Sequence, residues 1–245
     1  MSLNIVVCVK QVPDTAVERT LTSAGTLDRA SLDGLINELD EYAIEEGLKI
    51  AEAHGGEVTV LSMGADKAVH VSDEALAGSD ALATSLVLAA AVRSAGFDLV
   101  ICGSESTDAR TGVVPAMLAE RLGVPQLTLA SKVEISGTGV TVRRVSDEGY
   151  EVVTGSLPAV VSVVEKINEP RYPSFKGIMA AKKKPVQVLS LADLSVDPGA
   201  VGLANAATVV ADFAVRPARA AGEIVTDEGD GGVKAAAFLA GRKFI

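Results

Sequence analysis

The chain of 245 residues has few aromatic residues, two cysteines and a shortage of positive charge. Aromatic residues make up 3% of it, with no tryptophan, so Ala, Val, Ile and Leu must fill the core. Cys8 and Cys102 are too few for a disulfide scaffold, or for a zinc or iron–sulfur site built from cysteine. The formal net charge of −10 disfavours binding to nucleic acid, because the phosphate backbone repels an acidic protein.

Long apolar runs and targeting segments are also missing. The longest apolar stretch, Leu86–Val92, is too short to cross a bilayer. The N-terminus runs from Met1 directly into the apolar segment Ile5–Val9, without the basic and long apolar regions of a secretory signal. We therefore expect a cytoplasmic protein that does not insert into membranes.

The first half of the chain alternates between strand and helix patterns. Apolar, β-branched runs without polar alternation are typical of parallel strands that are covered on both faces. Strands are expected at 4–10, 57–62, 67–72 and 97–103, and helices at 40–54, 79–95 and 113–122. The helix at 79–95 is expected to have Ser79 as its cap and Asp80 in its first turn. This alternation predicts an α/β fold with a mainly parallel sheet flanked by helices.

The second half has a different pattern. Residues 126–136, 139–146 and 151–164 alternate around turn signals, which predicts antiparallel strands added to the sheet. Residues 168–185 are expected to form a basic, proline-containing loop, and a short helix is expected at 234–242. We place one α/β domain at 1–188. The remainder, 189–245, is expected to be an extended arm that docks on another protein, because it has too little local core to fold alone.

One connection is too short for this pattern. Only Met63–Asp66 separates the strands expected at 57–62 and 67–72. Parallel neighbours need a crossover of about a dozen residues or more. Two alternatives stay open, a hairpin or a missing helix, and the alternation on either side favours the helix.

The polar segment Gly103–Gly112 carries the clearest chemical signal. It follows a buried strand and opens a helix, and in open α/β sheets ligands bind beyond the carboxyl ends of the strands. Free backbone N–H groups and the partial positive charge of a helix N-terminus suit a phosphate, and the hydroxyls and Arg110 add donors. The segment matches neither the dinucleotide fingerprint nor the P-loop. The alternative is an ordinary polar loop with a helix cap.

A second feature is the run Asn168–Gly177 followed by Lys182–Lys184. Phe175 lies here in a proline-bounded loop, and exposed aromatic residues with basic neighbours often anchor protein interfaces. The alternative is that Phe175 folds back into the core and the lysines are only a solvated face. His54 and His70 have no third group at metal-ligand spacing, so we expect no metal site. The sequence shows no nucleophile paired with a general base, so it gives no indication of a catalytic centre.

Several runs resemble the β subunit of electron transfer flavoproteins, over almost the whole chain. They are NIVVCVKQVPDT, NELDEYAIEEGLKI, MGADKAVHV, DLVICGSESTDARTGVVPAMLAERLGVPQ and, as the most specific, LPAVVSVVEKINEPRYPSFKGIMAAKKK. The C-terminal run AGEIVTDEGDGG is similar to that of actinobacterial members.

The resemblance implies an electron carrier subunit and not an enzyme. It implies a heterodimer in which an α subunit holds most of a redox-active FAD and this chain binds a structural AMP. Electrons would pass from acyl-CoA dehydrogenases of fatty acid β-oxidation, and from other dehydrogenases, to a quinone oxidoreductase of the respiratory chain. The family's AMP contacts fall on Cys8, Asn37, Glu38, Leu39, Asp40, Met63, Gly103, Ser104, Glu105, Ser106, Thr107, Asp108, Ala109, Arg110, Thr111, Gly112, Val113 and Val114.

The family's segment for docking on dehydrogenases also has a counterpart in this chain. It falls on Arg171, Tyr172, Pro173, Ser174, Phe175, Lys176, Gly177, Ile178, Met179 and Ala180. Its apolar anchor falls on Phe175, where leucine is usual. At the short link after Met63, family members carry a helix of about four turns, on the order of 15 residues.

Three other functions stay open at this point. The first is a bifurcating relative in which a second FAD replaces AMP. The second is a stand-alone adenine-nucleotide enzyme of similar architecture. The third is an interaction scaffold without a nucleotide.

Overall fold

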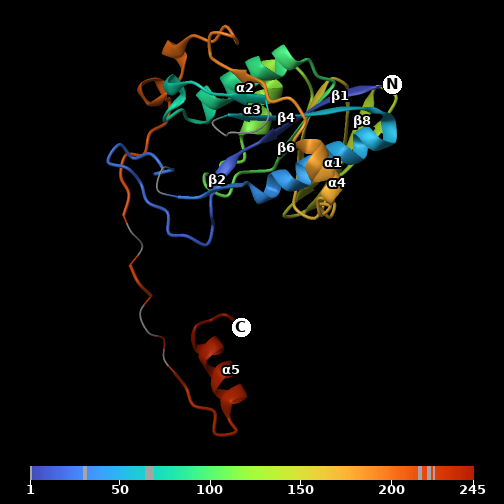
Figure 1. The fold of residues 1–245 in the computed structure, drawn as a ribbon. Coiled ribbons are helices and arrows are strands. Elements are labelled where there is room, and N and C mark those ends of the chain that lie inside the picture. The colour runs from blue at the N-terminus through green and yellow to red at the C-terminus, as the bar shows by residue number, and fades with distance from the viewer. Residues whose placement is uncertain (1, 30–31, 64–68, 215–216, 220–221, 223) are drawn as a thin grey trace. The chain divides into compact units, whose positions relative to one another are not determined.

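The computed structural model describes residues 2–29, 32–63, 69–214, 217–219, 222 and 224–245, and a single large sheet lies at its centre (Figure 1). The strands of this sheet are, in spatial order, β11 (Val188–Leu189), β5 (Val69–Val71), β4 (Gly56–Met63), β1 (Leu3–Val9), β6 (Leu99–Gly103), β10 (Ala159–Val163), β7 (Gln126–Ser136), β8 (Gly139–Ser146) and β9 (Gly149–Ser156).

The middle of the sheet is parallel. β1 pairs with β4 and β6, and β10 pairs with β6 and β7, all in parallel register. β6 and β10 are buried along their whole lengths, as expected of strands covered on both faces. Helices α2 (Ala81–Ala95) and α3 (Val114–Leu122) cover one face, and α1 (Glu38–His54) covers the other (Figure 1). The predicted α/β fold with a mainly parallel sheet is confirmed.

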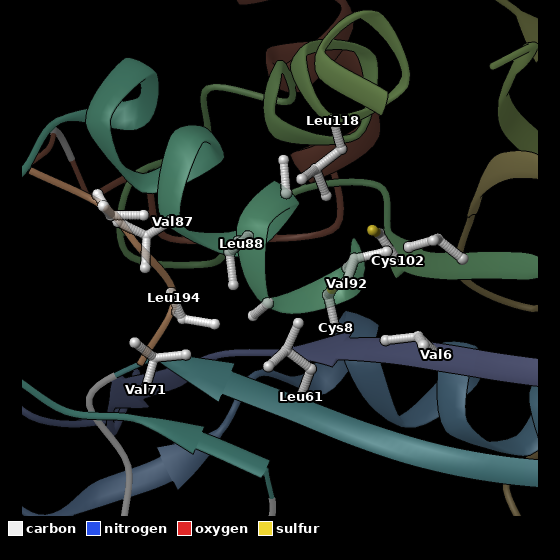
Figure 2. Close-up of a cluster of buried hydrophobic side chains, with 14 of the residues drawn as sticks. Val6, Cys8, Leu61, Val71, Val87, Leu88, Val92, Cys102, Leu118 and Leu194 are labelled. Atoms are coloured by element: carbon white, nitrogen blue, oxygen red, sulfur yellow. The ribbon is translucent and has the colours of Figure 1, made fainter. Parts of the chain in front are cut away.

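The core on the α2–α3 side consists of aliphatic side chains. Figure 2 shows residues of β1, β4 and β6 packed against Val87, Leu88 and Val92 of α2 and Leu118 of α3. Alanines on the inner side of α2 let the helix approach the sheet closely. Among the described residues no Phe or Tyr belongs to the fully buried set, so small aliphatic residues fill the interior, as the composition predicted.

The prediction of a single antiparallel strand at 151–164 is wrong. The segment forms two strands, β9, which pairs antiparallel with β8, and β10, which is inserted between β6 and β7. Pro158 separates them, and proline has no N–H to donate to a strand ladder. The apolar run of β10 suits a buried parallel strand, whereas β9 is largely exposed.

Two local expectations also need correction. Asp80, not Ser79, caps α2, because its carboxylate accepts a hydrogen bond from the Ala83 N–H at 2.9 Å. The Ser79 hydroxyl instead accepts a hydrogen bond from Gly202 N–H at 2.9 Å. The loop expected at 168–185 contains a short helix, α4 (Phe175–Ala181), because the Ser174 hydroxyl caps its first turn.

The compact unit extends beyond the boundary expected at residue 188. β11 joins the edge of the sheet, and Leu191, Leu194, Val196 and Val201 are buried in the α2–α3 core. Three short 3₁₀ turns at 74–76, 198–200 and 203–205 belong to the same body, which ends at Ala211. Residues 212–245 form a separate unit that contains helix α5 (Gly231–Gly241).

The connection between β4 and β5 bears on the short link. The two strands are parallel neighbours, with Ser62 opposite His70 and Met63 opposite Val71, and residues 64–68 of the predicted link lie outside the described residues. A parallel register excludes the hairpin alternative.

Two polar side chains of β4 and β5 are buried on the other side of the sheet. Leu61 and Val69 face the α2–α3 core, so Ser62 and His70 face the α1 side. There the buried Ser62 Oγ and His70 Nε2 have no hydrogen-bond partner in the described structure.

Candidate nucleotide site at the carboxyl edge of the sheet

The parallel strands bring several of the predicted site residues to one edge of the sheet. β1, β4 and β6 all end there, at Val9, Met63 and Gly103. The first turn of α1 and the segment 103–113, which leads from β6 into α3, meet at the same edge. This edge is the position where open α/β sheets bind their ligands.

Asn37, the residue before α1, holds the polar segment in place. Its side chain is completely buried, and its Nδ2 donates to the Glu105 carbonyl at 2.9 Å. Its Oδ1 accepts from the Thr107 N–H at 3.0 Å. One amide side chain therefore satisfies both a donor and an acceptor of the segment, so the predicted residues 37 and 105–107 do come together.

Asp40 links the ends of β1 and β6. Its carboxylate accepts hydrogen bonds from Asn37 Nδ2 at 3.0 Å and from the Lys10 N–H at 2.7 Å, and also from the Gly103 N–H. Burial raises the pKa of this carboxyl to about 7, against the lowering effect of these donors and of the Lys10 charge. Gly103 is required here, because a Cβ at this position would lie 2.4 Å from Asp40 Oδ1.

Asp108 points inward and is neutralised by two cations. Lys10 Nζ lies 2.7 Å from one carboxylate oxygen and Arg29 NH2 lies 2.6 Å from the other. Burial alone would raise the pKa of Asp108, but the hydrogen bonds and charge of Lys10, with help from Ser106 and Arg29, lower it to about 2. The segment therefore presents no free carboxylate of Asp108 to an anion.

The basic residues around the segment were partly missed by the sequence analysis. Arg19 NH1 donates to the Thr107 carbonyl at 2.9 Å, and Arg29 NH1 donates to the Gln11 carbonyl at 3.1 Å. Both arginines belong to the connection between two short strands, β2 (Gln11–Pro13) and β3 (Gly34–Ile36), which pair antiparallel. Nothing in this irregular stretch of sequence signalled the contacts with the polar segment, because Arg19 lies 88 residues from Thr107 and Arg29 lies 79 residues from Asp108.

The start of α3 is open to a ligand. The residue before it, Val113, provides no side-chain cap, and Pro115 in its first turn has no N–H. Within the described structure the other N–H groups of this turn therefore have no side-chain cap from Val113. Residues 110–113 are exposed, and Arg110 and Gly112 adopt left-handed backbone conformations with φ of 51° and 63°. Thr107 Oγ1 is buried without a partner in the described structure. Uncapped amides, a nearby guanidinium and an unused hydroxyl fit the phosphate of an adenylate.

Two other predicted contacts lie beside the core. The Cys8 side chain is buried in the α2–α3 core (Figure 2). Met63 packs against the same cluster. Cys8 lies opposite Cys102 in the β1–β6 register, and both are free thiols. The hydrogen bond between the two thiols, together with burial, holds the pKa of Cys102 well above its usual value. At Cys8 only the backbone is placed to contact a nucleotide.

The predicted docking segment is exposed at its apolar positions. Phe175 is 80% exposed and Tyr172 96%, so the alternative that Phe175 folds back into the core is wrong. Ile178 and Met179 extend the same surface along α4, and Lys182–Lys184 follow it. Within the described residues there is no cluster of three or more potential metal ligands and no helix that could span a membrane.

Comparison with known proteins agrees with this arrangement. Residues 24–194 match the family model described as the electron transfer flavoprotein domain. The chain is 50% identical to electron transfer flavoprotein subunit beta of Mycobacterium tuberculosis and of Mycobacterium leprae, in alignments of 264 positions that cover 99% of both chains. It is 34% identical to the caffeyl-CoA reductase-Etf complex subunit CarD of Acetobacterium woodii, with 91% of this chain and 92% of that protein covered.

The mycobacterial alignments extend over 264 positions, more than the 245 residues of this chain, so those relatives carry residues that have no counterpart here.

Proposed function

This chain belongs to the electron transfer flavoprotein family as a β subunit, and we propose that it binds one AMP at the Gly103–Val114 segment within a heterodimer. The FAD, held mostly by the α subunit, supplies the redox chemistry. The residues of this chain bind the adenylate, support the α subunit and present the docking surface. In this proposal the chain is an electron carrier subunit and has no catalytic residue of its own.

The observation that carries the AMP assignment is the open start of α3. Its uncapped N–H groups lie next to a loop that Asn37 and Asp40 hold in place, so the donors are ordered before a ligand arrives. Asp108 is paired with Lys10 and Arg29, which offsets the repulsion that its carboxylate would exert on a phosphate bound to this segment. Ordered donors bind an anion without an additional entropy cost.

The electron donors in this proposal are acyl-CoA dehydrogenases and other dehydrogenases, and the acceptor is a quinone oxidoreductase. An exposed aromatic side chain with apolar neighbours is the kind of anchor that enters a pocket on a partner, which supports the docking role of Phe175. Lys182–Lys184 form a local basic patch on an acidic protein, suited to an acidic partner surface.

The C-terminal arm is proposed to dock on the α subunit. In the unit 212–245, helix α5 exposes Val233, Phe238 and Leu239 at 74%, 51% and 39%. Its own unit leaves these apolar side chains uncovered, and a large apolar surface of this kind is typical of protein interfaces.

A second FAD in place of AMP is the alternative to this proposal. Flavin stoichiometry decides between the two: about one flavin per heterodimer supports AMP, and about two support the second FAD.

The test uses this chain co-expressed with its α subunit and analysed by native mass spectrometry. We expect a heterodimer with one flavin and one AMP that an acyl-CoA dehydrogenase reduces in the presence of its substrate. A chain that binds the α subunit but no nucleotide would favour an interaction scaffold. ATP turnover by the isolated chain would favour a stand-alone adenine-nucleotide enzyme.

Thr107→Val tests the site itself. Because Thr107 Oγ1 has no partner within the described structure, removing it should leave stability unchanged and reduce AMP retention about tenfold, the effect of losing one hydrogen bond to a charged group. Thr141→Val, at an exposed hydroxyl on β8, is the matched control. Equal AMP content in the two variants would refute the assigned role of this hydroxyl.

A further inference from the structure

Arg171 ties the start of the docking segment to helix α1 through two carboxylates. Its Nε and NH2 donate to Glu45 at 2.8 and 3.0 Å, and its NH1 and NH2 donate to Glu52 at 2.6 and 3.0 Å. Its backbone N–H donates to Glu45 at 3.2 Å. Glu45 and Glu52 lie two turns apart on the same face of α1. The planar guanidinium therefore bridges both carboxylates in the bidentate geometry that gives the strongest pairs.

Asn168, three residues before Arg171, contacts the same helix. Asn168 Nδ2 donates to the Tyr42 carbonyl at 3.1 Å and to Glu46 Oε2 at 3.0 Å. The helix that receives these bonds is itself fixed against the sheet. Gly47 lets it approach so closely that an added Cβ would lie 3.0 Å from Val7 of β1. Residues 168–171 are therefore anchored to the rigid part of the fold.

The chain beyond this anchor has few contacts of its own. Every residue from Tyr172 to Ala181 is exposed, and α4 has no buried residue. The apolar anchor Phe175 is only four residues beyond Arg171. Its position relative to the fold is thus determined largely by where Arg171 is held.

The Arg171 guanidinium is already committed within the chain. The hydrogen bonds from Arg171 lower the pKa of Glu45 and of Glu52, and those carboxylates raise the pKa of Arg171. Its Nε donates to Glu45, its NH1 donates to Glu52 and its NH2 donates to both, so little of its donor capacity remains for a partner protein.

We propose that Arg171 is a positioning residue, which orders the docking segment on α1 and does not itself contact the dehydrogenase. The inference rests on the proposed function, because it assumes that a dehydrogenase docks on this segment. A segment ordered before binding loses less conformational entropy when the partner arrives, so the bond network increases affinity without adding a contact.

The experiment compares variants of the complete αβ complex in a dehydrogenase-coupled assay and by amide hydrogen exchange. Arg171→Gln removes both carboxylate pairs, Glu52→Gln removes the exposed one, and Arg171→Lys keeps the charge but cannot bridge two carboxylates. Lys132→Gln is the matched control, because it removes one charge from an exposed ion pair, with Glu134 at 2.9 Å, that joins no two elements.

We expect Arg171→Gln to raise about tenfold the KM of the dehydrogenase for the αβ complex, because the docking segment is no longer ordered before binding. The kcat and the flavin spectrum should stay unchanged. Glu52→Gln and Arg171→Lys should have intermediate effects, and Glu52→Gln should add nothing in the Arg171→Gln background. Hydrogen exchange in residues 172–181 should accelerate in the same order. If Arg171→Gln does not fold, because Glu45 is then buried without a partner, Glu52→Gln and Arg171→Lys still provide the test.

Different failures have different meanings. An unchanged KM in these variants, an equal change in Lys132→Gln, or a loss of kcat without a change in KM would overturn the positioning role. A wild-type complex that no acyl-CoA dehydrogenase reduces would instead overturn the proposed function, and the positioning role with it.

Discussion

Replacing Gly103 by alanine should destabilise the protein, because no space exists for a methyl group at the end of β6. The added Cβ would lie 2.4 Å from Asp40 Oδ1 and 3.0 Å from the carbonyl carbon and oxygen of Leu39. The carboxylate cannot simply turn away, since it accepts hydrogen bonds from Asn37 Nδ2 at 3.0 Å and from the Lys10 N–H at 2.7 Å. Either the carboxylate moves and those donors lose their acceptor, or the first turn of α1 moves.

The magnitude follows from these two routes. Each buried donor left without an acceptor costs about 1–3 kcal/mol, and overpacking a filled interior costs about 1–3 kcal/mol. We therefore expect a loss of about 3 kcal/mol, which for a chain of this size corresponds to a Tm lower by about 6–12 °C.

The assay is thermal unfolding of the purified complex, together with its AMP content. Gly232→Ala is the control, because no atom lies within 4 Å of its added Cβ. In an Asp40→Ala background, Gly103→Ala should cost at least about 1 kcal/mol less, since residues in contact do not act additively. A Tm within about 1 °C of wild type, or equal costs in both backgrounds, would refute the close-packing argument.

Two further predictions concern pH and docking. Asp40 has a pKa of about 7 in the folded chain and an ordinary value of 3.8, so the folded state binds its proton more tightly. Stability should therefore fall as pH rises from about 4 to about 7, by at most about 1.4 kcal/mol per pH unit, and urea titrations at several pH values should show a smaller slope for Asp40→Asn. An identical slope would contradict the buried-carboxylate assignment. Phe175→Ala should leave stability within about 0.5 kcal/mol of wild type, since Phe175 is 80% exposed, yet raise the KM for the complex with a dehydrogenase. An unchanged KM would remove Phe175 from the docking surface.

Local patterns in the sequence were sufficient for the elements of the parallel half. The apolar runs that became β1, β4 and β6, and the amphipathic period of α1, depend on side chains close together in the chain. The strand β10 was not separable from β9 by pattern alone. Its place between β6 and β7 is decided by pairing partners more than 30 residues away in sequence.

The same distinction holds for the site. The sequence by itself determined that a polar, hydroxyl-rich segment follows a buried strand and opens a helix, because strand, loop and helix signals are local. The groups that hold this segment follow from tertiary contacts alone: Asn37 and Asp40 fix the loop, and Lys10 and Arg29 neutralise Asp108. The same is true of the docking segment, where Arg171 is bound to α1. These contacts join residues from 30 to 126 positions apart, and no periodicity along a chain encodes pairings at that separation.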